Sequence, residues 1–379
     1  MAAPTSIEIH GRCDAAFAAV REAFERNFTE HGDVGASVAV CLDGALVVDL
    51  WAGWADAART RPWGRDTIVN VFSTTKGMVA LAAHMLADRG RLDFEAPVAR
   101  YWPEFAQAGK QRMPVSYLLT HEAGLNVLEG DLSSEQARDW ETVVAQLARQ
   151  APRWEPGTKQ GYHTGTFGHL VGEVIRRVDG RSVGAFVREE IASPLGVEFL
   201  IGFGPEEDHR VAEVINDART PPAAGITAAI SAVDWNGRAV RAAELPSGNG
   251  HTNARALARI YGALACGGGV DGVRLLSAAA IEQARVERAN GVDATLSVPT
   301  HRTLGFMLPF AEFGDARPAG TFGHAGAGGS QGFADPERRL GFGYAMNQML
   351  SPQPGETRPP TGGMDPRGQR IVQALYRSL

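Results

Sequence analysis

The sequence predicts an α/β protein whose antiparallel sheet is built from both ends of the chain, is flanked by helices and carries an inserted, mostly helical domain. Two observations lead to this fold class. Runs typical of β-strands occur early and late in the 379-residue chain, whereas the middle, roughly residues 95–250, shows helical periodicity. We therefore expect an α/β sheet domain of residues 1–72 and 250–379 and a helical domain of residues 73–249, with the functional site in the cleft between them.

The first two elements are a helix and a β-hairpin. Apolar residues from Phe17 to Phe28 recur near helical spacing, which predicts an amphipathic helix over residues 14–28. Two β-rich runs then flank Asp43-Gly44, a dipeptide typical of two-residue hairpin turns. The early strands should therefore form an antiparallel pair.

The segment VFSTTKGMVALAAHMLADRG, which begins at Val71, carries the next helix. Its apolar residues repeat at helical spacing, and Gly90 at its end suits a helix C-cap. Further helical patterns follow at about 134–150, 166–178 and 183–192. These patterns make up the expected helical domain.

Strands return in three late stretches, RTLGFML, TFGHAGAGGSQGFAD and LGFGYAMNQM. A turn that opens at Asp335-Pro336 joins the last two. A final helix opens at Asp365-Pro366, an N-cap residue followed by proline at the first helical position.

Composition and charge exclude several classes of protein. A net charge of -6 gives no sign of a nucleic-acid-binding surface, and no run of eighteen apolar residues predicts a membrane span. The first residues lack the basic and apolar regions of a signal peptide. Cys13, Cys41 and Cys266 are odd in number and widely spaced, so we expect reduced thiols in a cytoplasmic protein, without a metal-ligand pattern.

The first candidate for chemistry is the pair Ser73 and Lys76. The chain has only three lysines, and Lys76 follows Ser73 by three residues, so on a helix both side chains share one face. A serine hydroxyl is a weak nucleophile until a base takes its proton, and a desolvated lysine can serve as that base. The helix N-terminus would also favour a developing oxyanion.

A rival nucleophile is Ser330, at the centre of the G-x-S-x-G match GGSQG. A nucleophile elbow needs a helix after the serine and a histidine later in the chain. Here a further strand is predicted to follow, and all ten histidines precede Ser330. The sequence therefore indicates a structural serine in a glycine-rich turn.

Besides Ser73-x-x-Lys76, four stretches resemble the serine β-lactamase superfamily, in its class C branch. They are RLDFEAPVARYWPEF, VSYLLTHEAGL, WEPGTKQGYHTGTFGHLVGEVI and GHAGAGG, and their order and spacing cover about residues 34 to 350. In detail the chain resembles the family VIII carboxylesterases, which keep this β-lactamase-like fold and hydrolyse simple esters.

The resemblance implies roles for individual residues by position. Ser73 would be the nucleophile, Lys76 its partner and Tyr162 the tyrosine of the second motif. The backbone N–H groups of Ser73 and Ala327 would form the oxyanion hole. The residues in the substrate-contacting positions are His163, Thr164, His324, Ala325 and Gly326.

Two departures from the lactamase pattern bear on substrate choice. Thr164 stands where the lactamases have an asparagine that binds the amide side chain of a β-lactam. His324 stands where they have a charged lysine that holds the β-lactam carboxylate. Both changes remove penicillin recognition and leave acyl transfer intact.

The resemblance thus implies a serine hydrolase that cleaves short-chain carboxylic esters through an acyl-enzyme, with no metal or organic cofactor. Lys76 and Tyr162 would titrate as a coupled pair, so the sequence leaves open which of them is the base. It also leaves open a β-lactamase or D-alanyl peptidase, an acyltransferase, and a non-catalytic binding protein on the same fold. The expected partner is a small-molecule ester, and the oligomeric state is open.

Overall fold

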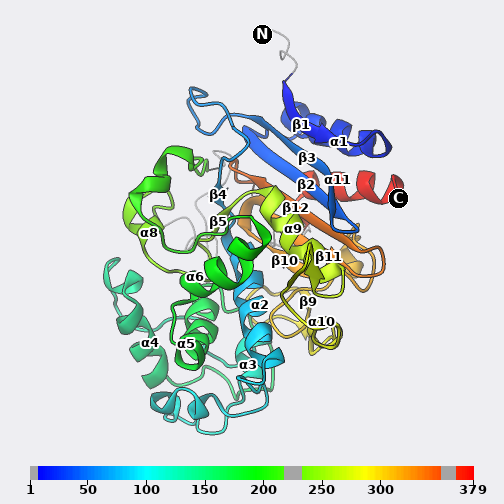
Figure 1. The fold of residues 1–379 in the computed structure, drawn as a ribbon. Coiled ribbons are helices and arrows are strands. Elements are labelled where there is room, and N and C mark those ends of the chain that lie inside the picture. Colours follow the sequence, from blue (N-terminus) through cyan, green and yellow to red (C-terminus); the bar gives the residue numbers. More distant parts are fainter. Residues whose placement is uncertain (1–6, 217–232, 351–363) are drawn as a thin grey trace.

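A six-stranded antiparallel sheet organises the fold, in the order β1-β3-β2-β12-β11-β10 (Figure 1). The computed structural model describes residues 7–216, 233–350 and 364–379. The strands of this sheet are β1 (Ile9–Cys13), β2 (Gly35–Leu42), β3 (Ala45–Gly53), β10 (Phe322–Ala325), β11 (Gln331–Asp335) and β12 (Leu340–Met346). Early and late strands meet where β2 pairs with β12, which confirms the predicted sheet from both ends of the chain.

Shorter strand pairs and ten helices complete the described parts of the chain. The pairs are β4 (Val69–Asn70) with β5 (His251–Thr252), β6 (Gly269–Val270) with β7 (Val273–Arg274), and β8 (Ala289–Val292) with β9 (Pro299–Arg302). The helices are α1 (Ala18–Glu30), α2 (Thr75–Asp88), α3 (Ser116–Leu119), α4 (Trp140–Arg149), α5 (Phe167–Asp179), α6 (Val183–Phe186), α8 (Arg238–Ala242), α9 (Ala254–Ala265), α10 (Ala278–Ala284) and α11 (Pro366–Arg377).

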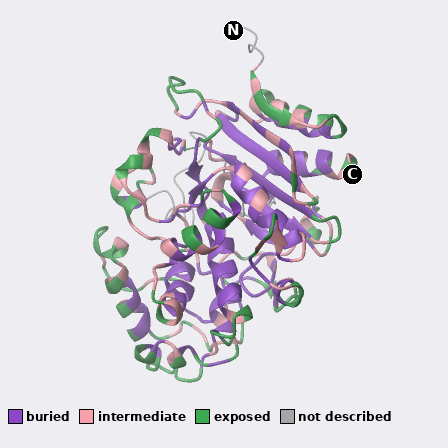
Figure 2. Cartoon of the chain, in the orientation of Figure 1, coloured by how far each residue is buried: buried purple, intermediate pink, exposed green. Residues whose placement is uncertain are grey.

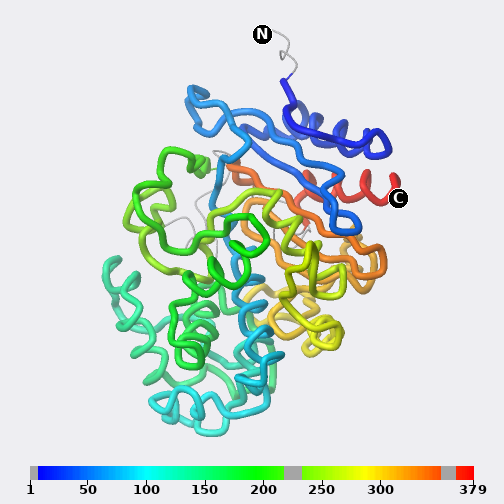
Figure 3. The backbone as a smooth tube through the Cα atoms, in the orientation of Figure 1, coloured from blue at the N-terminus to red at the C-terminus, as the bar shows by residue number. Residues whose placement is uncertain are grey.

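Helices cover both faces of the sheet. The terminal helices α1 and α11 lie side by side (Figure 3). Their apolar faces form one buried cluster with inward residues of β2, β3, β11 and β12. Helix α9 packs on the opposite face, where Ala254 and Ala258 contact Ala39 and Cys41 of β2. The central strands β2 and β12 are therefore buried on both faces, and they are apolar along nearly their whole length.

Helix α2 runs through the interior between the sheet and the helical part. Its residues from Thr75 to Leu86 are all buried (Figure 2). A helix enclosed on every side has no polar face, which explains the nearly continuous apolar sequence between Gly77 and Leu86. This helix carries Lys76 into the core.

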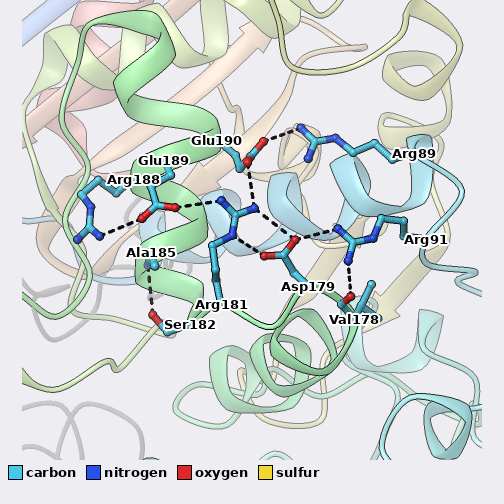
Figure 4. A network of polar contacts seen from close by, with 10 residues as sticks. All are labelled: Arg89, Arg91, Val178, Asp179, Arg181, Ser182, Ala185, Arg188, Glu189 and Glu190. Carbon is cyan, nitrogen blue, oxygen red and sulfur yellow. Dashed lines mark hydrogen bonds and ion pairs between the residues drawn. The ribbon is translucent and has the colours of Figure 1, made fainter.

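Ion pairs anchor the far end of α2 to the helical part. Arg91 pairs with Asp179 at the end of α5, and Arg181 bridges Asp179 to Glu190 of the π-helical turn η6 (Val187–Ala192) (Figure 4). Arg89 also pairs with Glu190, which closes the chain of contacts. The network holds α2, α5 and η6 in one arrangement.

Most predicted elements are confirmed, but the edge strand β1 was missed and one predicted strand is wrong. The hairpin turn has Asp43 and Gly44 with φ of 49° and 84°, as a two-residue turn of this class requires. The edge strand β1 was missed, because its exposed sequence, IHGRC, lacks an apolar alternation. The stretch RTLGFML is not a regular strand: β9 ends at Arg302, and Met307 makes only isolated bridges.

None of the helices in the described ranges has the length and apolar character needed to cross a membrane. The division into residues 1–72 with 250–379 and 73–249 stays a prediction, since one buried cluster contains residues of α2, α5, α9 and β10 together.

We predict that Gly341→Ala destabilises the protein, because β12 touches the backbone of α9 at this residue. A Cβ atom there would lie 2.1 Å from the nitrogen of Gly262 and 2.3 Å from the oxygen of Ala258, so the helix must move away from the sheet. We expect the free energy of unfolding in urea to fall by about 1–3 kcal/mol. Gly64→Ala is the control, because the nearest atom there, Thr67 Oγ1, is 3.6 Å away. Equal stabilities would contradict the close packing of α9.

Candidate active site

Ser73 lies in a short helical turn, η2 (Phe72–Thr74), between β4 and α2. The preceding residue, Phe72, has a φ of 46°, and its N–H donates to Asn70 Oδ1 at 2.8 Å. A left-handed conformation is costly for a phenylalanine and is found mostly at functional sites. Ser73 remains half-buried while its neighbours Phe72 and Thr74 are buried, so the hydroxyl is accessible.

Lys76 lies one helical turn after Ser73 and is completely buried. Its Nζ lies 3.1 Å from Ser73 Oγ and donates to the carbonyl oxygens of Thr164 at 2.9 Å and Ser247 at 2.7 Å. No carboxylate pairs with Lys76 among the residues that the structure describes. Burial, followed by the charge of Arg302, therefore holds the pKa of Lys76 well below its usual value.

Tyr162 packs against the same ammonium group. The Lys76 Nζ lies 4.8 Å from the centre of the Tyr162 ring. Burial raises the pKa of Tyr162 to about 12, although an interaction with the Ser73 hydroxyl opposes the rise. Near neutral pH the geometry thus favours a protonated Tyr162 beside a lysine that loses its proton easily. The three predicted catalytic residues are brought together.

His163 is not placed for the predicted substrate contact. Its Nδ1 donates to the Gly161 carbonyl at 2.6 Å, and its Nε2 accepts the N–H of Leu125 at 3.0 Å. The His163 N–H in turn donates to Nδ1 of His121 at 3.0 Å. Burial lowers the pKa of His163 to about 3. Both ring nitrogens are occupied within the protein, which favours a framework role.

Thr164 contributes to the site through its backbone, because its carbonyl oxygen accepts a hydrogen bond from Lys76. Its hydroxyl has no hydrogen-bond partner within the described ranges. A substrate contact by this hydroxyl stays a prediction.

The turn after β10 carries the other predicted oxyanion donor. Ala327 begins the turn η10 (Ala327–Gly329), and the N–H groups of Ala327 and Ser73 donate no hydrogen bond within the described parts of the chain. A Cβ atom at Gly326 would lie 2.2 Å from the Val71 carbonyl oxygen and 2.4 Å from Ser330 Oγ. Only glycine lets this turn approach the Ser73 segment so closely.

His324 lies at the base of this turn and is neutral. It is 3% exposed, and its Nδ1 donates to the Ala325 carbonyl at 2.8 Å. Burial, followed by the charge of Lys76, lowers the pKa of His324 to about 3. A neutral imidazole cannot replace the ammonium that would hold a substrate carboxylate. Ala325, by contrast, is half-buried.

Ser330 is a structural residue, in agreement with the sequence. Its side chain is fully buried, and Oγ donates to the Val71 carbonyl at 2.7 Å. It also lies 3.1 Å from Thr74 Oγ1. These bonds tie the turn that carries Ala327 to the segment that carries Ser73.

Sequence reasoning missed two further parts of the site. Ser247 supplies a carbonyl to Lys76, and Arg302 lies with its guanidinium 5.3 Å from the centre of the Tyr162 ring. Neither residue belongs to a short motif, so no local signal could have found them. In the described parts of the chain, no group of three or more His, Cys, Asp or Glu side chains could hold a metal ion.

Comparison with known proteins shows which family the chain resembles. The beta-lactamase family model matches residues 21–362. The esterase/beta-lactamase LipL of Mycobacterium tuberculosis is 39% identical over 368 residues, which is 91% of this chain and 84% of that protein. Esterase EstB of Burkholderia gladioli is 31% identical over 228 residues, 55% of this chain and 57% of that protein.

Two solved structures are similar over almost the whole chain. One is a family VIII carboxylesterase, 44% identical with a TM-score of 0.89, covering 98% of this chain and 100% of its own. The other is a penicillin-binding protein homologue from Caulobacter crescentus, 42% identical with a TM-score of 0.89 and the same coverage, 98% and 100%.

We predict that a fluorophosphonate probe labels Ser73 and that Ser330→Ala keeps this labelling. Ser73→Ala should lose several powers of ten in turnover. Ser330→Ala removes the hydrogen bonds of Oγ with Val71 and Thr74 behind the oxyanion turn, each a contribution of about 0.5–1.5 kcal/mol, so turnover should fall by about a hundredfold or less. Peptide mapping of the labelled protein locates the adduct. An adduct on Ser330, or equal losses in both variants, would contradict the assignment.

Proposed function

The chain belongs to the beta-lactamase family, and on this premise we propose that it cleaves short-chain carboxylic esters through an acyl-enzyme on Ser73. It is an ester-hydrolysing serine hydrolase of the beta-lactamase fold, a carboxylesterase. The observation that supports Ser73 as its nucleophile is the contact with a buried lysine that has no carboxylate partner in the described residues.

The hydrogen bonds of Lys76 favour it as the base. A neutral amine has two N–H groups and one lone pair, and Lys76 Nζ has two carbonyl oxygens and one hydroxyl around it. The two N–H groups satisfy the carbonyls, so the lone pair faces the proton of Ser73 Oγ. A charged ammonium would face the same hydroxyl with a third N–H and could not accept its proton.

Acylation then follows from these positions. Ser73 Oγ attacks the ester carbonyl carbon as its proton passes to Lys76, and the carbonyl oxygen becomes an oxyanion next to the N–H groups of Ser73 and Ala327. When the intermediate collapses, the bond to the leaving alkoxide breaks. Tyr162 gives that alkoxide its hydroxyl proton and recovers a proton from Lys76.

Deacylation repeats the sequence with water in place of Ser73. Lys76 takes a proton from the water, the oxygen of the water attacks the acyl carbon, and Ser73 Oγ leaves and is reprotonated. The acid product and the free enzyme result. An acyltransferase would use an alcohol instead of water at this step, so product analysis with added alcohol distinguishes the two.

Short esters suit the site because the group at the position of the lactamase lysine, His324, offers no fixed positive charge to a substrate carboxylate. His324 is neutral, and the buried Lys76 is occupied by backbone carbonyls. A β-lactamase remains the second candidate, because the name of the relative LipL joins esterase and beta-lactamase. The cytoplasmic location stays a prediction from the three free cysteines.

We predict that Lys76→Ala and Tyr162→Phe damage turnover severely and without additivity. Lys76→Ala removes the base, and Tyr162→Phe removes a proton donor whose contribution is about 10²–10⁴-fold. The double variant should be little worse than Lys76→Ala, because both residues move the same proton. Turnover of p-nitrophenyl butyrate measures each loss. A near-normal Tyr162→Phe would make Tyr162 a packing residue only.

We also predict that p-nitrophenyl butyrate is hydrolysed far better than benzylpenicillin. A hydrogen bond to a charged group contributes about 1.5–3 kcal/mol, so the absence of a carboxylate-binding cation should cost penicillin about ten- to a hundred-fold in kcat/KM. Nitrocefin, with its strained and activated ring, should be opened slowly. Measurement of kcat/KM for all three under one set of conditions tests this. Equal values for the penicillin and the ester would favour the β-lactamase.

A further inference from the structure

Arg302 is a buried cation beside the active site that the mechanism above does not use. It is the last residue of β9, and only 1% of its surface is exposed. Its Nη1 donates to Asp293 Oδ2 at 2.8 Å and to Gln160 Oε1 at 3.1 Å. Its guanidinium lies 5.3 Å from the centre of the Tyr162 ring. The arginine and its carboxylate are therefore placed directly behind the tyrosine.

Asp293 holds the backbone of the same tyrosine. Its Oδ1 accepts the N–H of Tyr162 at 3.0 Å and those of Thr295 and Leu296 at 2.8 Å each. The ring of Tyr162 thus contacts one member of the ion pair and its backbone N–H the other. A buried carboxylate with four hydrogen bonds is a rigid support, because each bond would leave an unpaired group if it broke.

The charge of Arg302 is only partly neutralised by hydrogen bonds. Its Nε and Nη2 are buried and have no hydrogen-bond partner in the described parts of the chain. Burial of N–H groups without hydrogen-bond acceptors is unfavourable. If the Arg302–Asp293 pair served stability alone, we would expect these N–H groups to have acceptors. Unpaired N–H groups in a region of low dielectric leave a positive field that acts on the nearby ring.

We propose that Arg302 is a positioning residue of the catalytic centre, which together with Asp293 holds Tyr162 in place and applies a second buried positive charge to Tyr162 and Lys76. This inference rests on the proposed function, since it concerns the residues that move protons there. Arg302 touches no reacting atom and acts through its two neighbours.

The charges around the site agree with this role. Burial has the largest effect on the pKa of Lys76, and the charge of Arg302 lowers this pKa further. The charge of Arg302 also lowers the pKa of Tyr162, by more than the charge of Asp293 raises it. The titratable groups that face these two residues are Arg302, Asp293, Ser73, His121, His163 and His324. Burial keeps the three histidines neutral, so Arg302 is the cation that affects the pair.

The field of Arg302 would act on both groups that move protons in the mechanism. A positive charge nearby disfavours the ammonium form of Lys76, so it favours the neutral base in the free enzyme. It also stabilises the phenolate that Tyr162 briefly forms when its O–H bond breaks and the proton joins the leaving alkoxide. The proton returns from the Lys76 ammonium to the phenolate oxygen, and the charge at the centre is restored.

The test is the pH profile of kcat/KM for p-nitrophenyl butyrate, whose acid limb reports the protonation of Lys76 in the free enzyme. Arg302→Gln combined with Asp293→Asn removes both charges and keeps similar shapes, so no buried charge is left alone. We expect its acid limb to move to higher pH, with activity on that limb reduced by about tenfold for each unit moved. Asp293→Asn alone keeps the charge of Arg302, so its acid limb should not move to higher pH.

Two variants serve as controls. Arg302→Lys keeps the positive charge, so its acid limb should stay near that of the wild type even if its melting temperature falls. Arg317→Gln combined with Asp315→Asn removes another buried pair, 2.6 Å apart and at most 5% exposed, and should leave the limb unchanged. Melting curves recorded for every variant separate loss of folding from loss of charge.

A limb that moves to higher pH in the double variant but not in Asp293→Asn or Arg302→Lys would support the inference. An unchanged limb in the folded double variant, or an equal upward shift in Asp293→Asn, would overturn it and leave Arg302 a structural residue. Failure of the proposed function looks different, because Ser73→Ala and Lys76→Ala would then keep esterase activity. If Ser73→Ala and Lys76→Ala are inactive while the acid limb of the Arg302→Gln, Asp293→Asn double variant does not move, only the present inference fails.

Discussion

The active site depends on one costly arrangement, the burial of Lys76 without a carboxylate partner in the described residues. Removing an ammonium group from water costs several kcal/mol, and the carbonyls of Thr164 and Ser247, the Ser73 hydroxyl and the Tyr162 ring offset part of this cost. The neutral amine avoids most of that cost. The burial that destabilises the folded protein therefore also favours the form of Lys76 that can act as a base. Helix α2 has to be apolar and enclosed for this to hold, and the chain places it between the sheet and the helical part (Figure 2).

The turn that carries the predicted oxyanion donor Ala327 needs a rigid support, and the sheet provides it. Ser330 ties that turn to Val71, and Arg367 of α11 donates to the carbonyl oxygen of Gly328. Arg367 is itself fully buried and pairs with Asp33 at 2.6 Å and with Asp365. The C-terminal helix is therefore connected, through one side chain, to the backbone that presents Ala327. The two ends of the chain thus form one side of the site, and α2 forms the other.

Charge explains how one fold can serve both esters and β-lactams. The nucleophile and base need only a buried lysine and a nearby tyrosine, whereas recognition of a penicillin needs an additional cation at the rim. Here the group at that position, His324, is neutral, and the second cation, Arg302, lies behind Tyr162 and away from solvent. The positive charge thus lies beside the groups that move protons, while the predicted substrate-contact residues Thr164 and Ala325 are uncharged. The distribution suits uncharged esters.

The sequence alone was enough to predict the hairpin at Asp43-Gly44, the terminal helices and those of the middle of the chain, the sheet made from both ends and the group Ser73, Lys76 and Tyr162, because turn residues, apolar periodicity and motif spacing are local signals. The helix α9, which covers one face of the sheet, was not predicted. Tertiary structure decided the rest. Whether His163 faces substrate or framework depends on Leu125 and Gly161, and whether His324 is charged depends on how deeply it is buried. Arg302 and Ser247 carry no motif and reach the site only through folding. Local patterns record what a segment prefers, whereas desolvation and the field at a buried group are set by residues distant in the chain.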